Sequence, residues 1–127
     1  MKVLFIEDDR MNRRVVKDML DVAGVEMIEA DSAETGIGML DDAAIDMLLV
    51  DLRMPGMDGI TAIRHIRARD DATGRLPIIV VTADAGPDLR DRCLDAGADD
   101  VLFKPVAMEA LFEAMGRLMG RDGGVIA

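Results

Sequence analysis

The sequence predicts one α/β domain in which helices cover both faces of a parallel sheet. Its 127 residues are a length typical of a single domain. Short apolar runs alternate five times with segments of helical periodicity or helix-capping signals. The runs are apolar at nearly every position, which is typical of strands buried on both faces. In such a fold the loops after the strands meet at one edge of the sheet, so chemistry is expected there.

The expected strands are apolar runs bounded by charged or turn-forming residues. In chain order they cover residues 3–6, 25–30, 45–50, 76–81 and 101–103. Pro77 stands near the start of the fourth strand, where a missing N–H is tolerated. The polar segment before it, residues 69–75, is expected to be a loop.

The expected helices cover residues 10–23, 31–42, 58–68, 87–96 and 108–119. In the first, apolar residues recur at helical spacing until Gly24 stops it. Asp31 and Glu34 have capping-box spacing at the start of the second, and Asp58 can cap the third. Gly97 ends the fourth, as glycine often does after a helix. The domain is expected to cover residues 1–120, with a flexible tail at 121–127.

Composition excludes several classes of function. The formal net charge is −10 and only three residues are aromatic, so direct binding of nucleic acid is not expected. Cys93 is the only cysteine, which rules out an internal disulfide and fits a reducing cytoplasm. No apolar run is long enough to span a membrane, and the one after Met1 and Lys2 is too short for a signal peptide.

Charged and polar residues follow four of the expected strands. Glu7–Asp9 ends the first, Asp51 the third, Thr82 the fourth and Lys104 the fifth. Clustered carboxylates repel one another, and the repulsion is answered by a raised pKa or by a hard divalent cation. Mg²⁺ prefers oxygen ligands and commonly takes one or two carboxylates plus a phosphate oxygen. The alternative is a set of strand-end caps and salt bridges without chemistry.

Together these groups suit the transfer of a phosphoryl group. Its oxygens need a metal, a cation and a hydrogen-bond donor, which Mg²⁺, Lys104 and Thr82 would supply. An ionised aspartate is itself a nucleophile and needs no general base. The sequence therefore suggests that Asp51 forms an aspartyl phosphate.

The same stretches carry a resemblance to a known family. The chain resembles the receiver domains of bacterial two-component response regulators, the CheY-like family, from residue 2 to about residue 118. The motifs that carry the resemblance are Glu7–Asp8, Asp51–Gly59, Val81–Ala83 and Phe103–Pro105. The resemblance implies a doubly wound, five-stranded parallel sheet of order 2-1-3-4-5, the flavodoxin/CheY-like fold.

The resemblance also implies roles for individual residues. Asp51 is the expected phosphoacceptor, and Thr82 and Lys104 are expected to bind the phosphoryl oxygens. The peptide bond between Lys104 and Pro105 is expected to be cis.

Mg²⁺ is the cofactor that the resemblance implies. Asp8, Asp51 and the backbone carbonyl of Arg53 are expected to bind it directly. Glu7 is expected to act mostly through water.

Two departures from the family concern how the signal leaves the site. Receivers usually carry Tyr or Phe three residues before the lysine, where this chain has Val101. Phe103 stands directly before the lysine, where small residues are more usual. Val101 is stiff and too small to act as an aromatic switch. The loop Thr82–Pro87 is therefore expected to move instead, with partner contact at the fourth helix, fifth strand and fifth helix, or at the first helix.

The expected function is that of a single-domain response regulator, not an enzyme, in the cytoplasm as a monomer or weak dimer. It would take a phosphoryl group from a histidine kinase or histidine phosphotransfer protein and signal through contact with a downstream protein target. The start of the first strand next to Met1, and the lack of room for an output domain, favour a free-standing protein. The alternative is a receiver module detached from a hybrid histidine kinase.

Two functions of other classes remain open. A flavodoxin-like cofactor binder would need a phosphate loop rich in glycine and hydroxyls where this chain has Glu7–Asp9. An aspartyl-phosphate hydrolase typically needs a second aspartate two residues after the nucleophile, where this chain has Arg53. Turnover of added phosphoesters would favour the hydrolase.

Several other side chains are expected to be structural. His65 lies on a predicted helix without ligand partners at suitable spacing. Cys93 is expected to pack within a helix. Arg13, Arg14 and Lys17 on the first helix are expected to be solvated rather than functional, although Arg10 and Arg14 could meet an acidic partner. Four methionines near the active edge are candidates for core packing or for a docking surface: Met11, Met54, Met57 and Met108.

Overall fold

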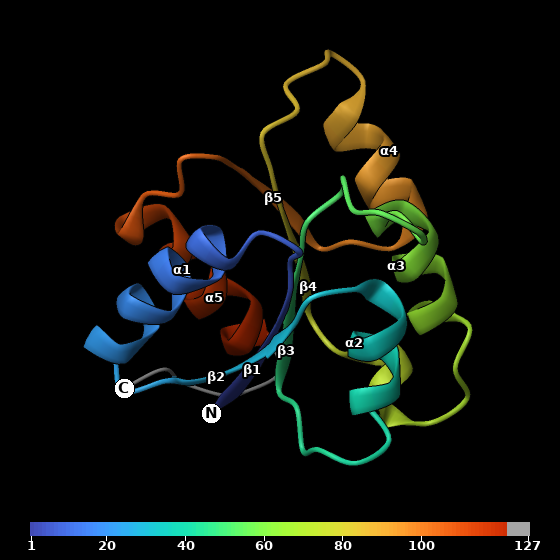
Figure 1. Ribbon diagram of the computed structural model, residues 1–127, viewed down its shortest axis with the longest axis horizontal. Helices are drawn as coiled ribbons and strands as arrows, with labels where there is room; N and C mark the ends of the chain where they lie inside the picture. The colour runs from blue at the N-terminus through green and yellow to red at the C-terminus, as the bar shows by residue number, and fades with distance from the viewer. Residues whose placement is uncertain (122–127) are drawn as a thin grey trace.

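The computed structural model describes residues 1–121 as a five-stranded parallel sheet with helices on both faces (Figure 1). The strands are β1 (Lys2–Ile6), β2 (Glu26–Ala30), β3 (Met47–Val50), β4 (Ile78–Thr82) and β5 (Asp100–Phe103). The helices are α1 (Arg10–Val22), α2 (Ala33–Met39), α3 (Gly59–Arg67), α4 (Leu89–Ala96) and α5 (Met108–Arg121), with a short 3₁₀ helix η1 (Ala72–Arg75) before β4. The strand order is β2-β1-β3-β4-β5, which confirms the predicted fold class.

The sheet separates two hydrophobic cores. In β1, β3 and β4, alternate residues point to opposite faces, and nearly every side chain is fully buried. On one face Leu4, Leu48 and Val80 pack with α2, α3 and α4. On the other, Phe5 and Leu49 pack with α1 and α5. Figure 1 shows the same division, with α1 and α5 on one side of the sheet and α2, α3 and α4 on the other.

The helix starts follow the predicted caps in α3 but not in α2. The Asp58 carboxylate accepts a hydrogen bond from the Thr61 N–H at the start of α3. At α2 the capping-box prediction is wrong, because Ser32 is the N-cap and its hydroxyl accepts from the Thr35 N–H. Glu34 instead reaches across to another loop. The helix ends at Met39, short of the predicted end near Asp42.

The last helix is longer than predicted. It runs to Arg121, so it enters the segment that was expected to be a tail, and residues 122–127 lie outside the described part of the chain. Across residues 1–121, no helix combines the length and the apolar character needed to cross a membrane.

Candidate functional site

Three carboxylates meet at the carboxyl edge of the sheet. Glu7 and Asp8 follow β1, and Asp51 follows β3, which pairs with β1 in parallel register. One oxygen from each carboxylate lies within 4.8 Å of one from each of the others. Glu7 and Asp51 are buried while Asp8 is exposed, so the cluster opens to solvent on one side.

The backbone of Asp51 is held from two directions. Its N–H donates to the Ile6 carbonyl at 3.0 Å, which extends the β1–β3 ladder to the site itself. At the start of α3, a Cβ on Gly59 would lie 2.3 Å from the Asp51 carbonyl oxygen. Only glycine permits this approach, so α3 packs directly against the backbone that carries the Asp51 carboxylate.

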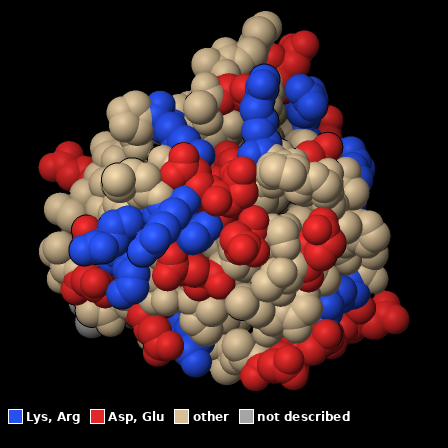
Figure 2. All heavy atoms as spheres, in the orientation of Figure 1, with Lys and Arg blue, Asp and Glu red and all other residues tan. Residues whose placement is uncertain are grey.

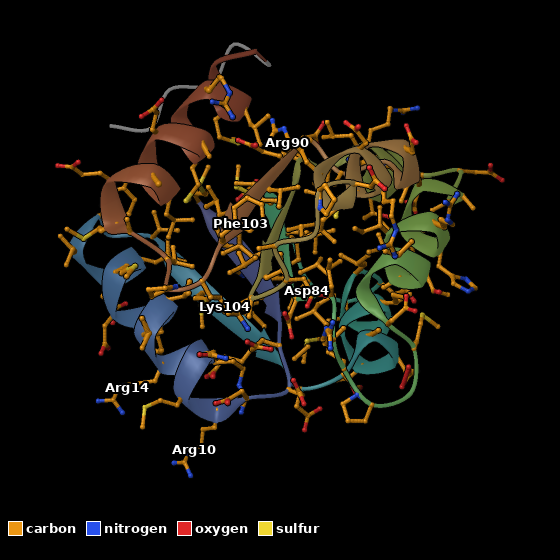
Figure 3. All side chains as sticks on the ribbon, turned by 90° about the horizontal axis from the view of Figure 1, so that it is seen from above. Arg10, Arg14, Asp84, Arg90, Phe103 and Lys104 are labelled. Carbon is orange, nitrogen blue, oxygen red and sulfur yellow. The ribbon has the colours of Figure 1, made fainter. Side chains whose placement is uncertain are left out.

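Lys104 supplies the positive charge that the sequence predicts. Its Nζ lies 2.6 Å from Glu7 Oε1 and 3.3 Å from Asp51 Oδ1. Burial alone would lower the pKa of Lys104, but the hydrogen bond to Glu7 and the charge of Asp51 outweigh it and raise that pKa. Lys104, which directly follows β5 (Figure 3), therefore stays charged and contacts both carboxylates.

The bond to Lys104 satisfies only one of the two carboxylate oxygens of Glu7. Burial, together with the neighbouring Asp51 carboxylate, raises the pKa of Glu7 despite the lysine. Its second oxygen, Oε2, is buried and has no hydrogen-bond partner among the described residues. A buried orphan oxygen beside two further carboxylates is the donor set that a hard cation such as Mg²⁺ fits.

Thr82 ends β4 at the same edge and is buried. Its hydroxyl accepts a hydrogen bond from the Asp84 N–H at 3.0 Å, so the side chain is tied to the loop that follows. The Asp84 carboxylate in turn pairs with Arg53, with Oδ1 2.7 Å from the arginine Nε. This loop therefore links the end of β4 to the segment after Asp51.

The strand-five departures are visible in the structure. Val101 is buried, whereas Phe103 is 46% exposed and lies beside Thr82 in the β4–β5 register. The Lys104–Pro105 bond is cis, as predicted.

Two contacts at the site carry no sequence signal. Arg13, on α1, donates from Nη1 to the Glu7 carbonyl at 2.7 Å. Glu34, on α2, accepts a hydrogen bond from the Met57 N–H at 3.1 Å and so ties α2 to the loop after Asp51. Neither pair belongs to a recognisable motif, because each joins elements that only the fold brings together.

His65 and Cys93 lie away from this chemistry. His65 is exposed on α3. Cys93 is fully buried, and burial raises the pKa of its thiol, which disfavours the reactive thiolate. Both residues behave as the sequence predicts.

Comparison with known proteins identifies the family. The family model described as the response regulator receiver domain matches residues 3–116. The chain belongs to this family. Receiver domains are in general signalling modules and not enzymes, and the family binds Mg²⁺ in its active site.

The relatives of this receiver domain include free-standing proteins and parts of larger ones. The chemotaxis protein CheY of Pseudomonas aeruginosa is 34% identical over 125 residues, which cover 98% of this chain and 100% of that protein. The virulence sensor protein BvgS of Bordetella pertussis is also 34% identical over 125 residues. There the alignment covers 95% of this receiver domain but only 10% of BvgS.

A solved structure matches the receiver domain over nearly its whole length. It is the receiver domain of the sensor histidine kinase PA1611 from Pseudomonas aeruginosa, with a magnesium ion coordinated in the active-site cleft. It has a TM-score of 0.85 and 33% identity, and the match covers 94% of this chain and 97% of that one.

Proposed function

We propose that this receiver domain accepts a phosphoryl group on Asp51 from a phosphohistidine protein, in a Mg²⁺-dependent reaction. One observation carries the proposal: the Asp51 carboxylate lies beside Lys104 Nζ, at 3.3 Å, and within the cluster that it forms with Glu7 and Asp8. A nucleophile, a cation and a set of metal ligands thus converge at one point.

The step conserves atoms and charge in a simple way. An Asp51 carboxylate oxygen attacks the phosphorus, a new O–P bond forms, and the P–N bond to the donor imidazole breaks with its electron pair going to nitrogen. Lys104 neutralises negative charge on the phosphoryl oxygens, and Thr82 donates its hydroxyl proton to one of them as a hydrogen bond. Because Asp51 attacks as the carboxylate, no general base is required.

Asp8 and Asp51, from the carboxylate cluster, would hold Mg²⁺, with the orphan oxygen of Glu7 available through water. The Arg53 carbonyl is the third direct ligand that the family resemblance implies. When bound, the ion offsets the charge of the carboxylates and of the phosphoryl oxygens.

We propose that α1 is one surface that meets protein partners. Arg10, Met11, Arg14 and Val15 are exposed on this helix, and Met11 is 69% exposed. Figure 2 shows basic side chains gathered over α1 beside the acidic edge, and Figure 3 shows Arg10 and Arg14 pointing away from the domain. The partners are a histidine kinase or phosphotransfer protein and a downstream protein target, met in the cytoplasm by a monomer or weak dimer.

Both a single-domain regulator and a module of a hybrid kinase are supported by the relatives. We propose the single-domain regulator, since CheY of Pseudomonas aeruginosa is matched over its whole length. The alternative, a module of a hybrid kinase, is supported by the equal identity to one tenth of the length of BvgS. The size of the native protein on an immunoblot of its source cells distinguishes them.

The phosphoacceptor is tested by intact mass after incubation with acetyl phosphate and Mg²⁺. Wild type should gain one phosphate and Asp51→Asn should gain none. Uptake by the variant at the wild-type rate would show that another residue is the acceptor. Sustained release of phosphate from many added phosphoesters would instead favour an aspartyl-phosphate hydrolase.

A further inference from the structure

Arg13 makes two bonds that connect α1 to the carboxyl ends of two strands. Its Nη1 donates to the Glu7 carbonyl at 2.7 Å, and its Nε lies 3.0 Å from Glu29 Oε1 on β2. The side chain is only 15% exposed although it lies on the outer helix layer. A guanidinium held by two acceptors in this way has a fixed orientation.

The peptide that Arg13 contacts joins Glu7 to Asp8, the two residues after β1 that belong to the carboxylate cluster. The Glu7 N–H donates to the Ala30 carbonyl at 2.9 Å, so this residue is bonded on its other side to β2. The orientation of the next peptide, from the Glu7 carbonyl to the Asp8 nitrogen, is then set by Arg13.

Asp8 depends on this backbone more than the other carboxylates do. Glu7 and Asp51 both contact Lys104, whereas the exposed Asp8 carboxylate has no hydrogen bond or ion pair within residues 1–121. With no side-chain contact to hold it, the direction of Asp8 follows from its backbone.

We propose that Arg13 is a positioning residue that orients Asp8 for Mg²⁺ through the Glu7 carbonyl. This inference rests on the proposed function, because it assumes that the carboxylate cluster binds the ion. Residues that hold metal ligands from behind commonly contribute about 10–100-fold to metal affinity.

The charge of Arg13 makes the proposal easy to separate from simple electrostatics. Removing a positive charge near a cation site should strengthen Mg²⁺ binding, since the ion then meets less repulsion. Removing a positioning contact should weaken it. The two effects have opposite signs at Arg13.

Arg14 is the matched control. It is the next residue on α1, but it is 72% exposed, and within the described part of the chain it pairs only with Asp18, at 3.4 Å. Arg14→Gln therefore removes the same charge without touching the Glu7 carbonyl.

The test is a Mg²⁺ titration of wild type, Arg13→Gln, Arg13→Lys and Arg14→Gln, in which changes in the backbone amide chemical shifts report binding. Wild type should bind Mg²⁺, both Arg13 variants should bind about tenfold more weakly, and Arg14→Gln should bind as tightly as wild type or slightly more tightly. Thermal melting in EDTA checks folding, and if Arg13→Gln is unfolded, Arg13→Lys carries the comparison because it keeps the charge.

Equal or tighter binding by a folded Arg13 variant would overturn the positioning role. Absence of Mg²⁺ binding by wild type would instead overturn the proposed function, so the two failures can be told apart.

Discussion

Arg53 and Asp84 are the residues two positions beyond Asp51 and Thr82, and the structure pairs them at 2.7 Å. Arg53 is 81% exposed, so this ion pair is screened by solvent and is not expected to stabilise the fold. Because the two residues follow Asp51 and Thr82 so closely, we expect the pair to hinder or orient the water that would hydrolyse the proposed aspartyl phosphate. Replacing both residues with Ala should change the dephosphorylation rate several-fold.

The rate is followed by the loss of the phosphorylated mass after the donor is removed. A suitable control is the double alanine variant of Lys17 and Asp21, an exposed ion pair on α1 at 3.7 Å. If the Arg53 and Asp84 variant decays at the wild-type rate, the pair has no part in phosphate lifetime.

Asp100 is a buried carboxylate at the edge of the sheet, held by the Val101 N–H, by Arg90 at 3.0 Å and by Arg117. Burial alone would raise the pKa of Asp100, but these bonds outweigh it and lower the pKa below the ordinary value of 3.8. Because the pKa of Asp100 is lower in the folded protein, its ionised carboxylate stabilises the fold at pH values above the pKa of the unfolded chain. This stability is lost as the pH falls through the pKa of the folded protein.

Asp100→Asn should therefore lower the free energy of unfolding at pH 7 by about 1–2 kcal/mol, a modest loss because both arginines are half exposed. Urea denaturation of both proteins at several pH values measures this. The difference should shrink below pH 3.8. A gap that stays constant well below that pH, where Asp100 becomes protonated, would mean that the carboxylate charge contributes nothing.

Most residues of the site could be predicted from the sequence, because the end of a buried strand is marked by the change from apolar to charged or polar residues. Glu7, Asp51, Thr82 and Lys104 each follow an apolar run, and a parallel sheet brings such ends together whatever the details of packing. The prediction that Arg13 is solvated was wrong, because its side chain is 15% exposed and its bond to a backbone carbonyl depends on how α1 lies across β1.

At the scale of elements, we expect the β4–α4 loop to respond to a movement of Thr82. The hydroxyl accepts from the Asp84 N–H, so a movement of Thr82 toward a phosphoryl group either breaks that bond or draws the loop inward. Space for this exists, since a hollow of about 290 Å³ lies beside residues 84–89. The N-cap residue Asp88 makes no side-chain capping bond, so the start of α4 is weakly held.

Adding a beryllofluoride phosphate mimic should accordingly cause the largest amide shift changes, beyond the site itself, between Thr82 and Gly97. Val101 is buried and β-branched, which leaves it no second position to occupy. Phe103 is the residue to watch, since it is exposed beside Thr82. If Val101 and Phe103 change most while the loop stays still, β5 carries the signal.

Element ends were harder to predict than element types. The sequence places the fourth strand at Leu76, but the Leu76 carbonyl accepts from Arg67 on α3, so the strand begins after Pro77. At α2, Asp31 and Ser32 are both good N-cap residues, and the spacing of Asp31 and Glu34 wrongly favoured Asp31. In the structure Ser32 caps the helix, and Glu34 accepts a bond from the Met57 N–H instead of completing a capping box. In each case a contact from a distant element decided the boundary.

At the scale of the whole molecule, the net charge of −10 adds to the electrostatic repulsion that folding must overcome to form the carboxylate cluster. Folding brings Glu7, Asp8 and Asp51 together, and Lys104 offsets only part of their repulsion. An ion that binds the folded chain and not the unfolded one must therefore raise the stability of the entire domain.

Mg²⁺ at ten times its dissociation constant should stabilise the domain by about 1.4 kcal/mol, which for a chain of this size raises Tm by roughly 4–7 °C. Asp8→Ala removes an exposed carboxylate that makes no hydrogen bond or ion pair within residues 1–121, so in EDTA the variant should melt at or above the wild-type temperature. In Mg²⁺ it should lose most of the gain. The equivalent Asp18→Ala, an acidic residue on the exposed side of α1, should keep the full shift. Melting curves with and without Mg²⁺ decide the matter, and an undiminished shift in Asp8→Ala would place the ion elsewhere on the molecule.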